Sequence, residues 1–226
     1  SHPRLRYVFS RKTLSMPDNW EFAWGHARGK YVLYLCDDDS YLPNTLSYLA
    51  ENIIDKKKPV MSWELAQYTY PTWVNPTTCN SLVIPASQSA VKVYQTETLR
   101  EDLTKFRGDR MWWPRLNNSC VEYSVLESYR KKLGRLFFPL CPDYSLMNIV
   151  FHVFPEICVV HRPLSIAGQT AEGIGASQVC FGENQTSNRF LEEFGDLKRF
   201  ERCASNIPLV PNLIAMTLLK VNAALS

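Results

Sequence analysis

The chain has 226 residues, of which 46% are hydrophobic and 21% are charged, and its formal net charge is +3. A chain of this length and composition can bury a substantial core, so we expect one globular domain, or one domain with an appendage. The net charge is too small to indicate a nucleic-acid-binding protein, and we expect no nucleic-acid partner. No apolar run is long enough for a transmembrane helix.

The first 60 residues predict alternating strands and helices. Residues 6–10 are typical of a short strand, and residues 20–27 repeat apolar side chains at helical spacing after a capping residue, Ser15. Residues 31–35 form a continuous apolar run, which is typical of a strand covered on both faces in a parallel sheet. Pro43 then opens a second helix.

The later elements continue this pattern. Further strands are expected at residues 60–63, 68–70, 82–84, 137–140 and 157–160, and helices at 121–133 and 143–152. Gly134 stands where a helix ends, and Asp143 stands where a helix is capped. The sequence therefore predicts an α/β fold, with a mixed sheet whose central strands are parallel and are flanked by helices.

The apolar stretch at residues 213–225 and the seven cysteines give expectations about membrane contact and cellular compartment. Residues 213–225 are mostly apolar and predict a helix that packs on the domain, with contact to a membrane surface as the alternative. The seven cysteines are widely spaced without a C-x-x-C pair, which indicates neither a zinc site nor a disulfide framework. An odd number of scattered cysteines, with no recognisable secretory signal, favours a cytoplasmic location.

Three consecutive aspartates, Asp37, Asp38 and Asp39, follow the strand expected at residues 31–35. In open α/β sheets, ligands bind beyond the carboxyl ends of the strands. Adjacent like charges cost free energy unless a cation or hydrogen-bond donors offset the repulsion. Mg²⁺ or Mn²⁺ suits clustered carboxylate oxygens and would bridge them to substrate phosphates. The alternative is a solvated acidic turn that caps the next helix.

The residues around these acids resemble a known family. Gly29-Lys30-Tyr31, Asp37-Asp38-Asp39, Pro43 and Leu46 are similar to the G-x-Y-…-L-D-x-D-D-…-P-x-x-L segment of family 2 glycosyltransferases, which have the GT-A fold. The resemblance is good over residues 5–60 and looser over residues 135–175. Cys36 stands where many members have an acidic residue, and the family's usual first strand, helix and second strand are not recognisable before residue 6.

The resemblance implies an inverting, metal-dependent glycosyltransferase that moves a sugar from a nucleotide-diphosphate sugar to the hydroxyl of a glycan or other acceptor. Asp37 and Asp38 would contact the donor, while Asp38 and Asp39 would bind Mn²⁺ or Mg²⁺. The fold would be GT-A-like and truncated at its N-terminus. The catalytic domain would cover residues 1–200, and residues 201–226 would form a helical extension.

Two further site residues are expected. Asp143 follows the metal motif by about a hundred residues, where inverting members of the family carry an acid at the start of a helix. It would be the general base that removes the acceptor's proton, or it would only cap the helix. His161 would be a third metal ligand, as a late histidine is in some GT-A enzymes, or a structural histidine.

Other interpretations stay open at the level of the sequence. The chain could be an inactive GT-A domain that binds carbohydrate or serves in assembly, or a metal-dependent phosphatase of the haloacid dehalogenase type. The phosphatase motif D-x-D-x-T/V has Thr or Val where this chain has Tyr41. Trp112 and Trp113 are either a sugar-stacking surface or core, and residues 168–175 are either a lid or a plain connection.

Overall fold

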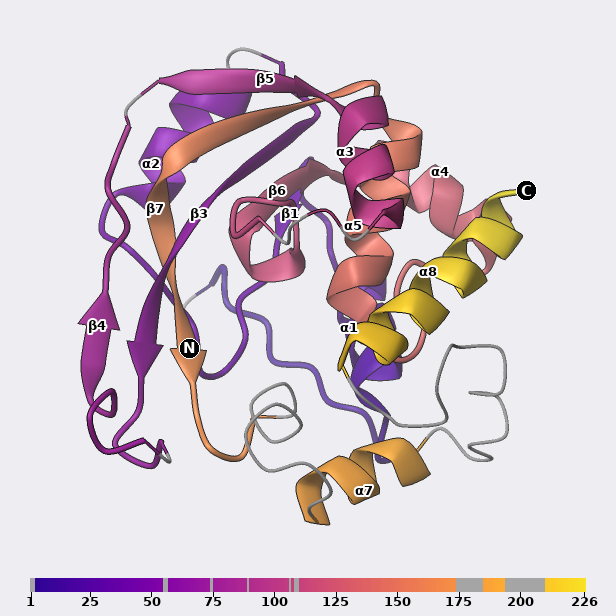
Figure 1. The fold of residues 1–226 in the computed structure, drawn as a ribbon. Helices are drawn as coiled ribbons and strands as arrows, with labels where there is room; N and C mark the ends of the chain where they lie inside the picture. The colour runs from indigo at the N-terminus through magenta and orange to yellow at the C-terminus, as the bar shows by residue number, and fades with distance from the viewer. Residues whose placement is uncertain are drawn as a thin grey trace.

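A computed structural model of the chain describes residues 3–54, 57–73, 75–88, 90–105, 107, 110–173, 185–193 and 210–226. Figure 1 shows a mixed α/β fold in which helices pack beside a curled sheet. The helices are α1 (Met16–Gly25), α2 (Thr45–Leu49), α3 (Thr96–Thr104), α4 (Tyr123–Leu133), α5 (Pro142–Val153), α7 (Gln185–Glu192) and α8 (Val210–Leu225). The strands are β1 (Tyr31–Leu33), β2 (Ser40–Tyr41), β3 (Val60–Thr69), β4 (Ser81–Val83), β5 (Val91–Gln95), β6 (Ser119–Glu122) and β7 (Glu156–Gln169). Two short turns of other helix types also occur, η1 (Ala50–Ile54) and η2 (Leu116–Asn118).

The sheet is mixed and has the strand order β1-β6-β3-β7-β2, with β4 paired to β3 and β5 paired to β7. Its two long central strands, β3 and β7, are parallel, as the sequence predicts. Strand β6 is antiparallel to both β1 and β3. Therefore β1, β3 and β7 all point in one direction, and their carboxyl ends lie toward the same edge of the sheet.

Local signals in the sequence set several helix ends. The Ser15 side chain accepts a hydrogen bond from the backbone N–H of Asp18, so Ser15 is the N-cap of α1 as predicted. Helix α4 ends at Gly134, whose φ of 79° lies in the left-handed region. A glycine adopts that region without the steric cost that a Cβ imposes. Both helices are confirmed, although α1 ends before residue 27.

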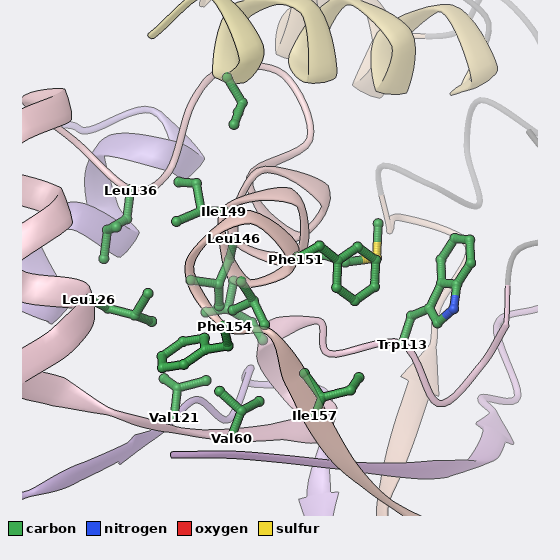
Figure 2. Close-up of a cluster of buried hydrophobic side chains, with 14 of the residues drawn as sticks. Val60, Trp113, Val121, Leu126, Leu136, Leu146, Ile149, Phe151, Phe154 and Ile157 are labelled. Carbon is green, nitrogen blue, oxygen red and sulfur yellow. The ribbon is translucent and has the colours of Figure 1, made fainter. Parts of the chain in front are cut away.

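The main hydrophobic core lies between the sheet and helices α1, α3, α4, α5 and α8. Figure 2 shows α5 running through this core between the sheet and α8, with its own side chains Leu146, Ile149 and Phe151 projecting from it into the core. Each large side chain that is fully buried in this way contributes about 1.5–3 kcal/mol. A second cluster, which includes Leu49 and Ile53, lies under α2 and η1.

Helix α8 packs against α5, as expected for the apolar stretch near the end of the chain. Leu213, Met216 and Val221 are buried on its inner side. The hydroxyl of Thr217 accepts hydrogen bonds from the backbone N–H groups of Leu140, at 3.2 Å, and Cys141, at 3.1 Å. In the part of the chain that is described, no helix has the length and apolar character needed to cross a membrane.

Several predicted strands are wrong. Residues 6–10 form no strand, and Tyr7 and Phe9 are exposed with their rings stacked on each other. Residues 137–140 also form no strand, and they lead directly into α5. The apolar run at residues 31–35 is a strand only from Tyr31 to Leu33.

That strand does not have the position that its apolar run predicts. Strand β1 is the end strand of the described sheet, where it pairs only with the antiparallel β6. Val32 is buried but Leu35 is half exposed. The expectation of a strand covered on both faces is therefore corrected to an edge strand with one well-buried side chain.

Other boundaries also differ from the expectation. Strand β6 occupies residues that the sequence predicts as the start of the helix at 121–133. Strand β7 is much longer than residues 157–160 and continues to Gln169, so Gly168 belongs to a strand. Residues 170–173 follow it, and residues 174 and 175 of the predicted loop lie outside the described residues.

Candidate functional site

The three aspartates lie in a turn just beyond the carboxyl end of β1. The backbone N–H of Asp39 donates to the carbonyl of Cys36 at 3.2 Å, which closes the turn. Asp37 is exposed, whereas Asp38 and Asp39 are half-buried. The Tyr41 hydroxyl donates to the carbonyl of Tyr34 at 2.9 Å and ties the chain before the turn to β2, which follows it.

The Asp39 carboxylate is held from two sides by segments far along the chain. Its Oδ1 accepts the backbone N–H of Gly168, in β7, at 3.0 Å. Its Oδ2 accepts the side-chain amide of Asn117, in η2, at 3.1 Å. The thiol of Cys36 also hydrogen-bonds to this carboxylate. A carboxylate has about four acceptor positions, so one remains. Asp39 thus joins the turn, η2 and the end of β7 without using all of its oxygen lone pairs.

Gly168 brings β7 unusually close to the aspartates. A Cβ built on Gly168 would lie 2.0 Å from the carbonyl oxygen of Asp38, a distance that real Cβ atoms do not reach. The same carbonyl accepts the hydroxyl of Tyr70 at 3.4 Å. The absence of a side chain at position 168 therefore allows the acidic turn and β7 to touch.

One group of side chains in the described residues could hold a cation. A sulfur or oxygen atom from each of Cys36, Asp38 and Asp39 lies within 4.8 Å of the others. Burial, followed by the charges of the three aspartates, raises the pKa of the Cys36 thiol to about 12. A thiol is a soft ligand, and Mg²⁺ and Mn²⁺ prefer oxygen ligands. The two carboxylates are the ligands that remain, and they suit Mg²⁺ or Mn²⁺ completed by water and phosphate oxygens.

The Asp38 carboxyl is the member of this group whose ionisation is disfavoured. Burial, then the negative charges of Asp39 and Asp37, raise its pKa, while a hydrogen bond from its own backbone N–H acts in the opposite direction. A cation beside it would reverse this balance, because an opposite charge favours the ionised form. A cation bound at this turn would therefore stabilise the ionised carboxylate of Asp38.

Asp143 lies in the first turn of α5 and is half-buried. The expectation that it is the N-cap is wrong: the N-cap is Cys141, and no side chain makes a cap hydrogen bond there. Pro142 occupies the first helical position, so Asp143 is the second helical residue, two places past the N-cap. A carboxylate in the first turn is still stabilised by the helix dipole.

The short segment around η2 links Asp39 to the start of α5. Asn117 in this segment donates to Asp39, as described above. The guanidinium of Arg115, two residues earlier, lies over the ring of Tyr144, 5.1 Å from its centre. Tyr144 is the neighbour of Asp143 in the first turn of α5. A single segment thus contacts both the acidic turn and the helix start that carries Asp143.

His161 lies elsewhere. It is in the middle of β7, seven residues before Gly168, which corresponds to roughly 20 Å along a strand. Its Nδ1 is 3.0 Å from an oxygen of Glu64, and its Nε2 is 2.8 Å from the hydroxyl of Tyr94. Both ring nitrogens therefore have protein partners, and the structure does not bring His161 to the aspartates.

The two other sequence candidates are also placed. Trp112 and Trp113 are both buried, Trp112 stacked on Tyr94 and Trp113 edge-on to Phe151. They are core side chains and not a sugar-stacking surface.

Asn117 was not expected at the site, because it belongs to no catalytic motif and its only sequence signal is that of a glycosylation sequon.

No model of a known protein family matches the chain, and no curated protein matches it either.

Proposed function

We propose that the chain is a metal-dependent glycosyltransferase of the family 2 type, with a GT-A-like fold, which transfers a sugar from a nucleotide-diphosphate sugar to an acceptor hydroxyl. The observation that carries this proposal is the Asp38–Asp39 pair, held at the carboxyl end of β1 against the carboxyl end of β7. Ligands of α/β proteins bind at this kind of edge. Two adjacent carboxylates there suit a cation that carries a diphosphate.

Asp38 and Asp39 would hold Mn²⁺ or Mg²⁺, and Asp37, which is exposed next to them, would contact the donor. The bound cation would neutralise the charge that develops on the departing nucleotide diphosphate. The protein's own contribution at this point is to keep the two carboxylates together, and the donors from Gly168 and Asn117 support that arrangement.

Asp143 would be the general base. Its place in the first turn of α5 favours an ionised carboxylate, which is the form that a base needs at neutral pH. It would accept the proton of the acceptor hydroxyl as the hydroxyl oxygen attacks the anomeric carbon. The nucleotide diphosphate leaves from the opposite side, so the configuration at that carbon inverts. The contact of the η2 region with both the acidic turn and α5 supports a shared site for the two functions.

The metal site is tested by calorimetry with UDP or GDP and Mn²⁺. Wild type should release heat on binding, and Asp38→Asn should lose most of it because one of the two carboxylate charges is gone. Asp102→Asn is a suitable control, since Asp102 lies on α3 and pairs with Arg110. Equal heats for wild type and Asp38→Asn would contradict the assignment.

Turnover tests the function itself. Release of nucleotide diphosphate from nucleotide-sugars with Mn²⁺ should fall on the order of a hundredfold in Asp143→Asn, the usual contribution of a positioned base. Because Cys141 is the N-cap, Asn at position 143 should leave α5 intact. Wild-type activity in Asp143→Asn would show that the base lies elsewhere. Turnover of a phosphate monoester in place of a nucleotide-sugar would indicate a phosphatase, and glycan binding without turnover a binding module.

A further inference from the structure

A chain of hydrogen bonds to the sheet holds the backbone of Asn117 in place. Its backbone carbonyl accepts the hydroxyl of Ser165, in β7, at 2.9 Å. That hydroxyl in turn accepts the indole N–H of Trp63, in β3, at 2.8 Å. Trp63 and Ser165 are almost completely buried. Asn117 is therefore fixed to the two central strands of the sheet, outside the acidic turn.

The neighbouring Asn118 strengthens this attachment. It is fully buried, and its side-chain amide donates to the carbonyls of Trp63, at 2.9 Å, and Met111, at 2.8 Å. Its side-chain oxygen accepts the backbone N–H of Arg115 at 2.9 Å. Because buried polar groups with all their hydrogen bonds made form a rigid unit, η2 presents the Asn117 side chain in one place.

The direction of the Asn117 amide is set by chemistry. An ionised carboxylate can only accept hydrogen bonds, so the NH₂ group of Asn117, and not its oxygen, faces Asp39. Without that donor, the Asp39 carboxylate would lie beside the Asp38 carboxylate with only the Gly168 N–H and the weak thiol donor of Cys36 to hold it. Like-charge repulsion would then favour rotation of Asp39 away from Asp38.

We infer that Asn117 is the positioning residue of the site: with the Gly168 N–H, it fixes the Asp39 carboxylate so that Asp38 and Asp39 face one cation. This inference rests on the proposed function, because it assigns a role to Asn117 only if the two carboxylates bind a cation. Groups that hydrogen-bond to metal ligands orient those ligands, and their loss weakens metal binding about 10- to 100-fold. Asn117 has the position and the donor for that role.

The test compares Asn117→Leu, which keeps the approximate size and removes the donor, with Asn222→Leu. Asn222 is the matched control because it accepts an amide hydrogen bond from Asn148 at 2.9 Å, between α8 and α5. Two measurements are made on the full chain: the Mn²⁺ affinity in the presence of UDP, by electron paramagnetic resonance, and the amide signal of Gly168 without metal, by ¹H–¹⁵N NMR.

Asn117→Leu should weaken Mn²⁺ binding about tenfold or more and shift the Gly168 amide signal, because Asp39 is the acceptor of that N–H. Asn222→Leu should change neither, although both variants lose some thermal stability. Unchanged Mn²⁺ affinity in Asn117→Leu, with wild type binding normally, overturns the inference and leaves the proposed function standing. A wild type that binds no Mn²⁺ with UDP overturns the proposed function, and the role of Asn117 with it.

Discussion

Asp38 sits between two other aspartates in a half-buried turn, and this has a consequence for stability. Its pKa is raised, first by burial and then by the neighbouring charges. A raised pKa in the folded chain means that folding favours the protonated carboxyl. The corresponding stability is present below the unfolded-state pKa, about 3.9, and is lost as the pH rises through the folded-state pKa.

Asp38→Asn, which cannot ionise, should therefore unfold at a higher temperature than wild type at about pH 7, and this advantage should vanish at about pH 3. Circular dichroism melting curves without divalent cations at the two pH values would measure the difference. Under the proposed function, adding Mn²⁺ and UDP at pH 7 should reduce the advantage, because bound ligands would stabilise wild type. An equal difference at both pH values would mean that the ionisation of Asp38 does not affect folding.

Gly168 affects stability through its close contact with the carbonyl of Asp38. Gly168→Ala would place a methyl group against the carbonyl of Asp38, so β7 or the acidic turn must move. We expect a loss of about 1–3 kcal/mol in the free energy of unfolding, as for other overpacked positions. Urea denaturation measures it. Gly25→Ala is the control, since nothing lies within 4 Å of its added Cβ, and a helical alanine there should stabilise if anything.

At the scale of whole elements, Glu21 connects α1 to the segment between α4 and α5. One oxygen accepts the backbone N–H groups of Leu136 and Phe137, and the other accepts Arg130 Nε at 2.8 Å. Leu136 and Phe137 are fully buried, so their N–H groups have little access to water. This carboxylate therefore helps to set where the chain runs before α5 begins.

Glu21→Ala should cost about 3 kcal/mol, because it leaves two buried N–H donors without an acceptor and removes one of the two carboxylates that pair with Arg130. Thermal or urea unfolding of the purified variant is the measurement. The control is Glu101→Ala, which removes an exposed pair with Lys105 and should leave stability nearly unchanged. Similar losses in the two variants would show that Glu21 acts no differently from a surface charge.

The elements also show what the sequence can and cannot predict. Helix ends follow from chemistry within a few residues, so Ser15 and Gly134 were readable. Strand partners depend on distant residues. The run at residues 31–35 looks the same whether it lies at the centre or the edge of a sheet. Strand β6 runs into α4 without a break, which hides the change of structure.

The sequence likewise predicts some residues of the candidate site and not others. The Asp triplet is visible as a local pattern, and its place beyond the end of β1 follows from that strand. The partners of Asp39 could not be predicted, because Asn117 and Gly168 lie 78 and 129 residues away and meet it only after the sheet has formed. Asp143 was expected as a cap, but Pro142 takes the first helical position and moves the cap to Cys141.

At the scale of the molecule, the parallel pair β3 and β7 is the centre to which the other parts attach. Strands β6 and β4 pair with β3, whereas β2 and β5 pair with β7. Both central strands carry core side chains on their two faces. Strand β1, by contrast, pairs only with β6 in the described part of the sheet. The stability of the sheet should therefore fall from its centre toward β1.

Hydrogen exchange followed by mass spectrometry should show this gradient. Amides of β3 and β7 are expected to exchange last, near the rate of global unfolding, and amides of β1 and β4 much earlier, because edge strands open locally. Slower exchange in β1 than in β3 would contradict this gradient.

The contact between Asp39 and Gly168 also sets an order of events during protein synthesis. The ribosome makes the acidic turn first, and 129 further residues must follow before its partner in β7 exists. Until then Asp39 lacks the backbone N–H that holds its Oδ1. The acidic turn therefore cannot reach its final arrangement until β7 has been synthesised and has joined the sheet.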